Sequence, residues 1–321
     1  MRPHRQPAHT RTLTVRLAPA GGDRWSVDAR LLDVRKRGVV DVAGRVNGPG
    51  VVHDMRLSLA VTPAGDRVLD ARLQMASVPF PASARTGGEG CRDNEAGAAA
   101  LVGLPLGSGF LTGLQRIMGG VRGCFHVFTL MRLVAATTLR AVGSTGPMRA
   151  SFARTVTIDT SWTGDRLTLH GALTDVVSML GEGTERTSGL FEVDAVLEGA
   201  LPDLALERLD VLHRARGADG AYGWTAARLD GVGNLAGRSL VRGFAMLLGD
   251  AVPSRGPLAP VHDLLLMMQP AAFQAMPARP TPDAGGPHPR RPSAARDSCA
   301  MWRQDGPLVR AVEEEARGRA H

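Results

Sequence analysis

The chain has 321 residues, of which 44% are apolar and only 4% aromatic, enough for one large globular domain or two of ordinary size. Charged residues make up 21%, and the composition excludes a collagenous, disulfide-stapled or wholly disordered protein. The formal charge is +7, but its basic residues are arginines spread along the chain, with one lysine at Lys36. Because aromatic side chains for base stacking are also scarce, this pattern argues against a nucleic-acid partner.

From the sequence we expect neither a membrane-spanning segment nor a secretory signal. We find no apolar run that approaches the roughly 18 residues needed to cross a bilayer. The basic N-terminus has no apolar stretch behind it, so no secretory signal is expected. We therefore predict a cytoplasmic protein without a membrane partner, in which residues 1–9 are disordered.

Alternating apolar and polar residues predict strands in the first part of the chain. The alternating segments are Arg11–Val15, Trp25–Leu31, Met55–Val61 and Leu69–Met75. A turn at Pro63-Ala-Gly-Asp66 joins the last two segments, which predicts a hairpin in an antiparallel sheet.

The apolar period changes to a helical one after Pro79 and Pro81. Asp93 or Asn94 is a suitable cap for a short helix, and Ser108 for a second that runs through Met118. A third helix is expected from about Cys124–His126 to about Arg140. Strands followed by helices predict an α+β fold, with the helices packed on one face of the sheet.

The first part of the sequence is repeated later in the chain, in the same order and with altered loop lengths. The matching pairs are Arg11–Val15 with Arg154–Ile158, Met55–Met75 with Phe191–Val211, and Phe110–Gly119 with Leu240–Gly249. An ordered series of matches predicts a tandem duplication, with a first copy over 10–145 and a degenerate second copy over 150–276.

The remainder of the chain, 277–321, has a different composition, rich in proline, glycine and arginine. Residues 277–298 contain six prolines and a Gly-Gly pair, which predicts a disordered linker. The segment Leu308–Arg317 has the length of a short helix, but we expect a solvated tail there. Cys299 lies in this tail and is expected to have no role.

Polar residues in the first copy form the candidate site: His53, Asp54, Cys91, Cys124 and His126. Antiparallel strands reverse direction, so the start of one hairpin strand and the segment that leaves the other lie at the same end of the sheet. Cys91 follows that segment and can approach His53. Thiols and imidazoles are ligands for zinc or iron, and we predict such a metal site. The second copy has Gly189 and Leu190 in place of His53 and Asp54.

Two alternative functions remain open from the sequence. In one, Cys124 is the nucleophile of an enzyme, activated at a helix N-terminus with His126 or His53 as the base. In the other, the protein is a non-catalytic interaction or structural protein whose cysteines belong to the core. The partner is then an unidentified small molecule or protein.

Several of these motifs resemble a bacterial family known as domain of unknown function 2889. The resemblance is carried by Arg11-Thr-x-Thr-Val, Leu32-Asp33, His53-Asp54-Met55-Arg-Leu, Leu101-Val-Gly-Leu and Gly119-Gly…Gly123-Cys-x-His126. It covers about 10–145, and more faintly 150–276. In that family the Gly-Cys-x-His run is followed by a glutamate and later a glutamine, where this chain has Thr129 and Arg140. The second copy carries Asp263 and Gln274 there, which permits a site shared between the copies.

The same residues are also loosely similar to iron–sulfur cluster assembly scaffold proteins. In those proteins a ligand at the start of a hairpin, a cysteine after it and a His/Cys pair at a later helix hold zinc or a nascent cluster. On this analogy the ligands are Asp54, Cys91 and Cys124, with His53 or His126.

Overall fold

The structure is a computed structural model that describes residues 7–318 apart from 22, 41–45, 146–149, 181–184, 202, 217–221, 226–234, 241–242 and 277–295. Its strands are β1 (His9–Ala20), β2 (Arg24–Arg35), β3 (Val39–Val40), β4 (Val46–Asn47), β5 (Gly50–Val61), β6 (Val68–Ser77), β7 (Ala150–Thr163), β8 (Arg166–Leu180), β9 (Glu185–Ala200), β10 (Ala205–Arg216) and β11 (Tyr222–Thr225). Its helices are α1 (Phe110–Met118), α2 (Phe125–Thr145), α3 (Phe244–Ala251), α4 (Ala259–Ala275) and α5 (Pro307–Arg317).

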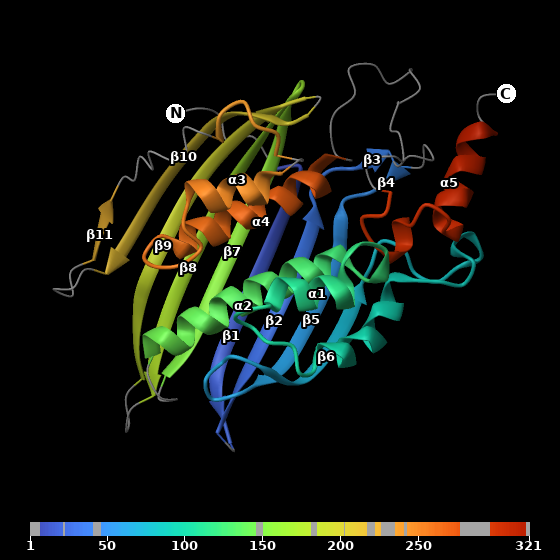
Figure 1. Cartoon of the computed structure of the whole chain (residues 1–321). Coiled ribbons are helices and arrows are strands. Elements are labelled where there is room, and N and C mark those ends of the chain that lie inside the picture. Colours follow the sequence, from blue (N-terminus) through green and yellow to red (C-terminus); the bar gives the residue numbers. More distant parts are fainter. Residues whose placement is uncertain are drawn as a thin grey trace.

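Nine strands form one antiparallel sheet in the order β11-β10-β9-β8-β7-β1-β2-β5-β6 (Figure 1). The centre of this sheet is the β1·β7 pair, in which Leu13 lies opposite Val156. Outward from that pair, each half of the sheet adds its strands in sequence order, apart from the two-stranded β3·β4 sheet in the first half. This order is what a duplicated unit would produce, and the duplication itself stays a prediction.

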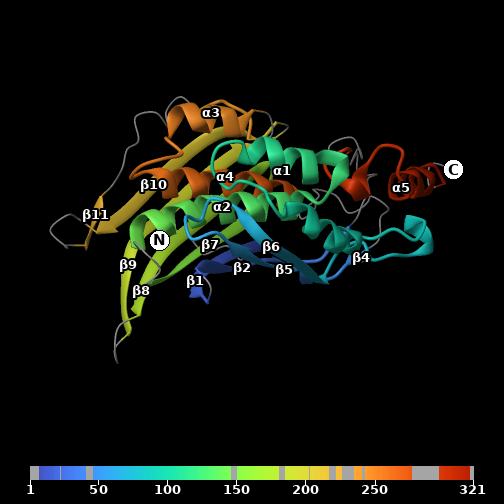
Figure 2. The same cartoon turned by 60° about the horizontal axis from the view of Figure 1, so that its bottom comes forward.

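The helices cover one face of the sheet and leave the other open (Figure 2). Helix α2 contacts β1, β2 and β7, while α4 contacts β1, β7, β8 and β9, so each spans the centre of the sheet. Helix α1 packs on α2, and α3 packs on α4. The predicted α+β class is confirmed. The helix expected near Asp93 is instead a 3₁₀ helix, Cys91–Leu101.

Alternation within the strands creates the core between these layers. In β1, Leu13, Val15 and Leu17 face the helices and are fully buried, while Thr12 and Thr14 face the opposite side and line a hollow there. The apolar helix α2 is the one candidate membrane span among the described residues, by length and composition. Because 56% of its candidate window is buried within the fold, this helix fits the core of a soluble protein.

The structure describes parts of both chain ends for which the sequence predicts disorder. Ala8 and His9 are buried, and His9 begins β1, so disorder does not extend over the whole of 1–9; residues 1–6 lie outside the described residues. At the other end, α5 packs on the first half rather than extending as a solvated tail. Most of the predicted linker 277–298 also lies outside the described residues.

The tail is held by both apolar and charged contacts. Leu308 and Val312 are buried, and the Phe80 and Trp302 rings meet edge to face with centroids 5.7 Å apart. Arg85 donates two hydrogen bonds to Glu315, at 2.7 and 3.0 Å. An amphipathic helix can bury its apolar face against a neighbouring surface. The proline-rich composition of the preceding segment does not indicate such a helix.

Truncation of the buried tail leucine should therefore destabilise the protein. We expect Leu308→Ala to lower the free energy of unfolding by about 2–5 kcal/mol, because it leaves a cavity where a buried side chain was packed. Urea unfolding measures this, with Arg310→Ala, an exposed position on the same helix, as the control. Equal midpoints for the two variants would show that the tail does not pack.

Candidate functional site

A group of polar side chains interrupts the apolar core at one end of the first half. His9 and Arg11 lie in phase with Leu13 on β1, and Asp33 and His53 occupy core-facing positions on β2 and β5. All four are at most 3% exposed. Burial of such groups is unfavourable unless they find partners, so their contacts decide what this site can do. We refer to these four residues with His126 as the polar cluster.

Arg11 and Asp33 form the charged centre of the polar cluster. They lie directly opposite each other in the β1·β2 register, and Arg11 donates from Nε and Nη2 to the two carboxylate oxygens at 2.8 and 2.7 Å. Burial alone would raise the pKa of Asp33, but Arg11, together with the neighbouring His53 and His9, holds that pKa well below its usual value. The pair is therefore charged in the folded protein.

Two imidazoles extend the cluster from this pair. His53 lies opposite Asp33 in the β2·β5 register, and its Nδ1 is 3.0 Å from Asp33 Oδ2. His126, in the first turn of α2, places its ring centroid 3.9 Å from that of His53. Burial lowers the pKa of both histidines, and for His126 the nearby positive charges add to the effect. Both rings are therefore neutral near pH 7.

The second half of the chain supplies a further member of the site. The Gln274 side chain, near the end of α4, places Nε2 2.6 Å from Nε2 of His126. This contact agrees with the inference that Gln274 belongs to a site shared between the halves. His126 itself keeps a partly exposed surface, so it is the member of the cluster closest to solvent.

The structure brings together only some of the predicted site residues. His53 and His126 are adjacent, and Cys124 Sγ lies 3.8 Å from Nδ1 of His126. Asp54 is not part of the cluster: it faces the opposite side of the sheet and accepts two hydrogen bonds from Arg30, at 2.8 and 2.9 Å. Successive residues of a strand point to opposite faces, so His53 and Asp54 cannot serve one buried site.

The thiols are buried, which favours their protonated form. Cys91 and Cys124 are free and buried, and burial raises their pKa to about 12 and about 11 respectively. Cys299 is nearby rather than remote, because the tail is fixed by a hydrogen bond from Ala300 N to Gly123 O at 2.8 Å. Burial raises the pKa of this third thiol too. Such thiols behave as core residues unless a metal replaces their protons.

Sequence reasoning missed His9, Arg11 and Asp33 as site residues. Arg11 and Asp33 served only as markers of the family resemblance. The signal that would have found them is their position: each occupies the core-facing phase of its strand, where an apolar residue belongs. Three such positions at neighbouring strand ends predict a buried polar group.

A related arrangement occupies the second half, where the buried His262 places Nδ1 3.7 Å from Oδ1 of Asp263. Arg154 donates from Nε and Nη2 to Asp175 at 2.7 and 2.8 Å, as Arg11 does to Asp33. It also donates from Nη1 to Asp263 on α4 at 2.6 Å. Arg140, near the end of α2, reaches Asp175 at 3.0 Å. Each long helix therefore contributes a side chain to the polar group of the other half.

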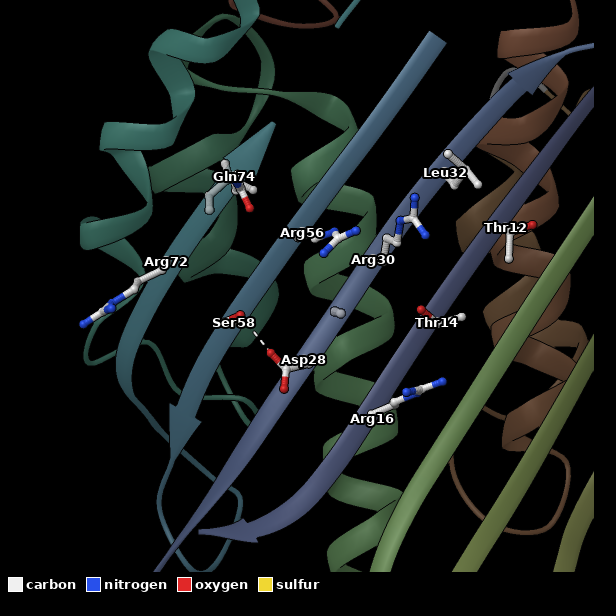
Figure 3. A pocket seen from close by; sticks show the side chains of 12 residues that line it. Thr12, Thr14, Arg16, Asp28, Arg30, Leu32, Arg56, Ser58, Arg72 and Gln74 are labelled. Carbon is white, nitrogen blue, oxygen red and sulfur yellow. Dashed lines mark hydrogen bonds between the residues drawn. The ribbon is translucent and has the colours of Figure 1, made fainter. Parts of the chain in front are cut away.

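The open face of the sheet carries a different feature, a hollow of about 880 Å³ over the first half (Figure 3). Its lining includes Arg16, Arg30, Arg56 and Arg72. Arg30 is paired with Asp54, and Arg72 lies 3.7 Å from Asp70. Because the lining contains neither histidine nor cysteine, we place the candidate chemistry at the buried polar cluster instead.

The fold and the cluster define an α+β protein with a buried Arg–Asp–His site. Residues 9–140 match the model of a family described as a protein of unknown function (DUF2889). No curated protein and no solved structure matches the chain. The family resemblance found in the sequence is confirmed, and what the site binds must be argued from its own residues.

Acid should destabilise this site in two stages. Because the folded-state pKa of His53 and His126 is lowered, the unfolded chain binds protons that the folded chain does not, and stability falls below about pH 6.5. The depressed pKa of Asp33 adds stability above about pH 4 that is lost as the pH falls further. We expect His126→Gln to flatten the first stage, measured by urea unfolding with a chelator present.

The control for this experiment is His170→Gln, because His170 is 58% exposed on the open face of the sheet. This variant should keep the wild-type dependence on pH. A slope between pH 8 and 5 that is the same in His126→Gln as in the wild type would contradict the assignment.

Proposed function

We propose that the protein binds a transition-metal ion, zinc or iron, at the polar cluster. The observation that carries this proposal is the convergence of one ligand atom each from Asp33, His53 and His126, all within 4.8 Å of one another. These residues come from β2, β5 and α2, so the fold rather than a local motif brings them together. Two imidazoles and a carboxylate are a donor set that suits both metals.

The surrounding contacts support a metal site. Asp33 orients the His53 ring through Nδ1, in the manner of a carboxylate that fixes a metal-bound histidine. The contact of Gln274 with His126 differs, because the Gln274 amide nitrogen donates to Nε2 of the ring, so an ion bound through Nε2 would displace this hydrogen bond. Cys124 is the nearest thiol, and it would become a thiolate ligand only if the ion displaced its proton.

The analogy to iron–sulfur scaffold proteins receives less support from these contacts. Asp54, one of the ligands implied by the analogy, is held on the other face by Arg30. We therefore propose a mononuclear site served by His53, His126 and Asp33. Neither Cys124 nor Cys91 belongs to this convergent group, and both remain additional ligands to be tested.

A second candidate function is a non-catalytic interaction or structural protein. The raised pKa of Cys91 and Cys124 favours it, because protonated, buried thiols behave as core side chains. The same values argue against a cysteine nucleophile, which requires a depressed thiol pKa. The Arg154–Asp175 pair also favours this candidate, because a similar buried arginine–aspartate pair lies in the second half, which has no residues equivalent to His53 and Asp54.

Metal analysis of the purified protein tests the proposal. We expect about one zinc or iron per chain in the wild type, measured by elemental analysis after chelator-free purification. His53→Ala and His126→Ala should lose at least about nine-tenths of this metal, because each removes an imidazole ligand. The exposed His170→Ala should retain it, and Cys124→Ala separates a thiol ligand from a core thiol.

Either of two outcomes would contradict the metal proposal: wild-type protein without stoichiometric metal, or equal metal in wild type and His126→Ala. In that case the interaction or structural candidate becomes the better explanation. Correct folding of each variant is checked by its urea unfolding midpoint, so that loss of metal is not confused with loss of structure.

A further inference from the structure

The two buried arginines differ in one hydrogen bond. Arg154 uses Nε and Nη2 on Asp175 and Nη1 on Asp263, so that each of its nitrogens has a carboxylate partner. Arg11 uses Nε and Nη2 on Asp33 in the same way, but its Nη1 has no hydrogen-bond partner among the described residues. Arg11 is fully buried, so solvent does not replace the missing acceptor.

The difference arises at one helix position. Asp263 is the fifth residue of α4, and Thr129 is the fifth residue of α2. Thr129 is buried, and its hydroxyl donates to Phe125 O at 2.9 Å, within its own helix. The first half therefore has no carboxylate where the second half places Asp263.

The helix correspondence is supported by a second pair of contacts. Arg140 and Gln274 are the sixteenth residues of α2 and α4. Both cross to the opposite half, where Arg140 reaches Asp175 and Gln274 reaches His126. The fifth positions of the two helices can therefore be compared directly.

A buried guanidinium nitrogen without an acceptor is unfavourable, and a buried arginine is normally satisfied by carboxylates. His9 adds a further unsatisfied atom, because its buried Nδ1 also lacks a hydrogen-bond partner among the described residues. These two atoms belong to neighbouring residues of the polar cluster rather than to scattered sites. An external acceptor at this place would satisfy them.

We propose that the polar cluster binds the carboxylate group of a small-molecule ligand, which accepts a hydrogen bond from Arg11 Nη1 as Asp263 does from Arg154. The proposal rests on the proposed function, because it concerns the same cluster and assigns the class of ligand that accompanies the ion. Arg11 already neutralises Asp33, so a bound cation leaves the cluster with net positive charge. An anionic ligand offsets that charge.

The carboxylate class follows from the second half of the chain. There the buried Asp263 carboxylate accepts a hydrogen bond from Nη1 of Arg154. A single free Nη1 donor matches a carboxylate, which carries one negative charge, better than phosphate, which is partly doubly charged at neutral pH and would leave excess negative charge buried.

Binding of acetate to the protein as purified tests this inference. Acetamide is the uncharged analogue of acetate, and phosphate is the other common oxyanion. We expect one equivalent of acetate by calorimetry, with acetamide and phosphate bound at least about tenfold more weakly. The metal content of the same samples is measured in parallel.

Variants at the two helix positions provide the decisive comparison. Thr129→Asp supplies the missing carboxylate from within the chain, so it should weaken acetate binding at least about tenfold. Its melting temperature should be higher than that of Thr129→Asn, the uncharged control. Asp263→Thr should do the opposite, lowering the melting temperature and gaining a second acetate equivalent that restores it.

Three results would overturn the proposal: no acetate binding by the wild type, equal acetate affinity in Thr129→Asp and Thr129→Asn, or phosphate bound more tightly than acetate. A Thr129→Asp protein less stable than Thr129→Asn would show that this position does not face Arg11, and would overturn it as well. Stoichiometric metal without acetate binding would contradict the carboxylate proposal and leave the metal proposal standing. Acetate binding by a protein that contains no metal would contradict the metal proposal and leave the carboxylate proposal standing.

Discussion

The buried pair of Arg11 and Asp33 is the interaction on which the first half depends. A charged pair inside a core is tolerated only when its remaining donors and acceptors are also satisfied. Asp33 meets that requirement through Arg11, with His53 and His9 beside it. The position of His53 and the unsatisfied Nη1 of Arg11 both follow from placing one ion pair on the core-facing side of two adjacent strands.

Much of the fold was predictable from local pattern, because strand alternation and helix period report burial directly. The strands around Trp25, Met55 and Leu69 and the helix that ends at Met118 all form near the expected bounds. The tail was not predicted, because proline-rich composition in 277–298 says nothing about the amphipathic segment that follows it. Burial of Leu308 depends on a surface far away in sequence.

The candidate site was predictable only in part, for two physical reasons. His53 and His126 were identifiable as chemically suitable residues, but the choice between His53 and Asp54 depends on which strand face is buried. Contacts such as that of Gln274 with His126 join residues 148 positions apart and depend on how two helices cross the sheet. Residue type alone also does not show that Cys91 and Cys124 are buried, and burial is what raises the pKa of their thiols.

The crossing of α2 and α4 has a consequence for how the two halves depend on each other. Separated at residues 146–149, each half would lose the side chain that the other contributes, and β1 and β7 would become exposed edges open to pairing with other chains. Two separate polypeptides would have to meet at a rate and to an extent set by their concentration. The peptide connection gives each half a permanently high effective concentration of its counterpart, so that the shared site assembles at any dilution.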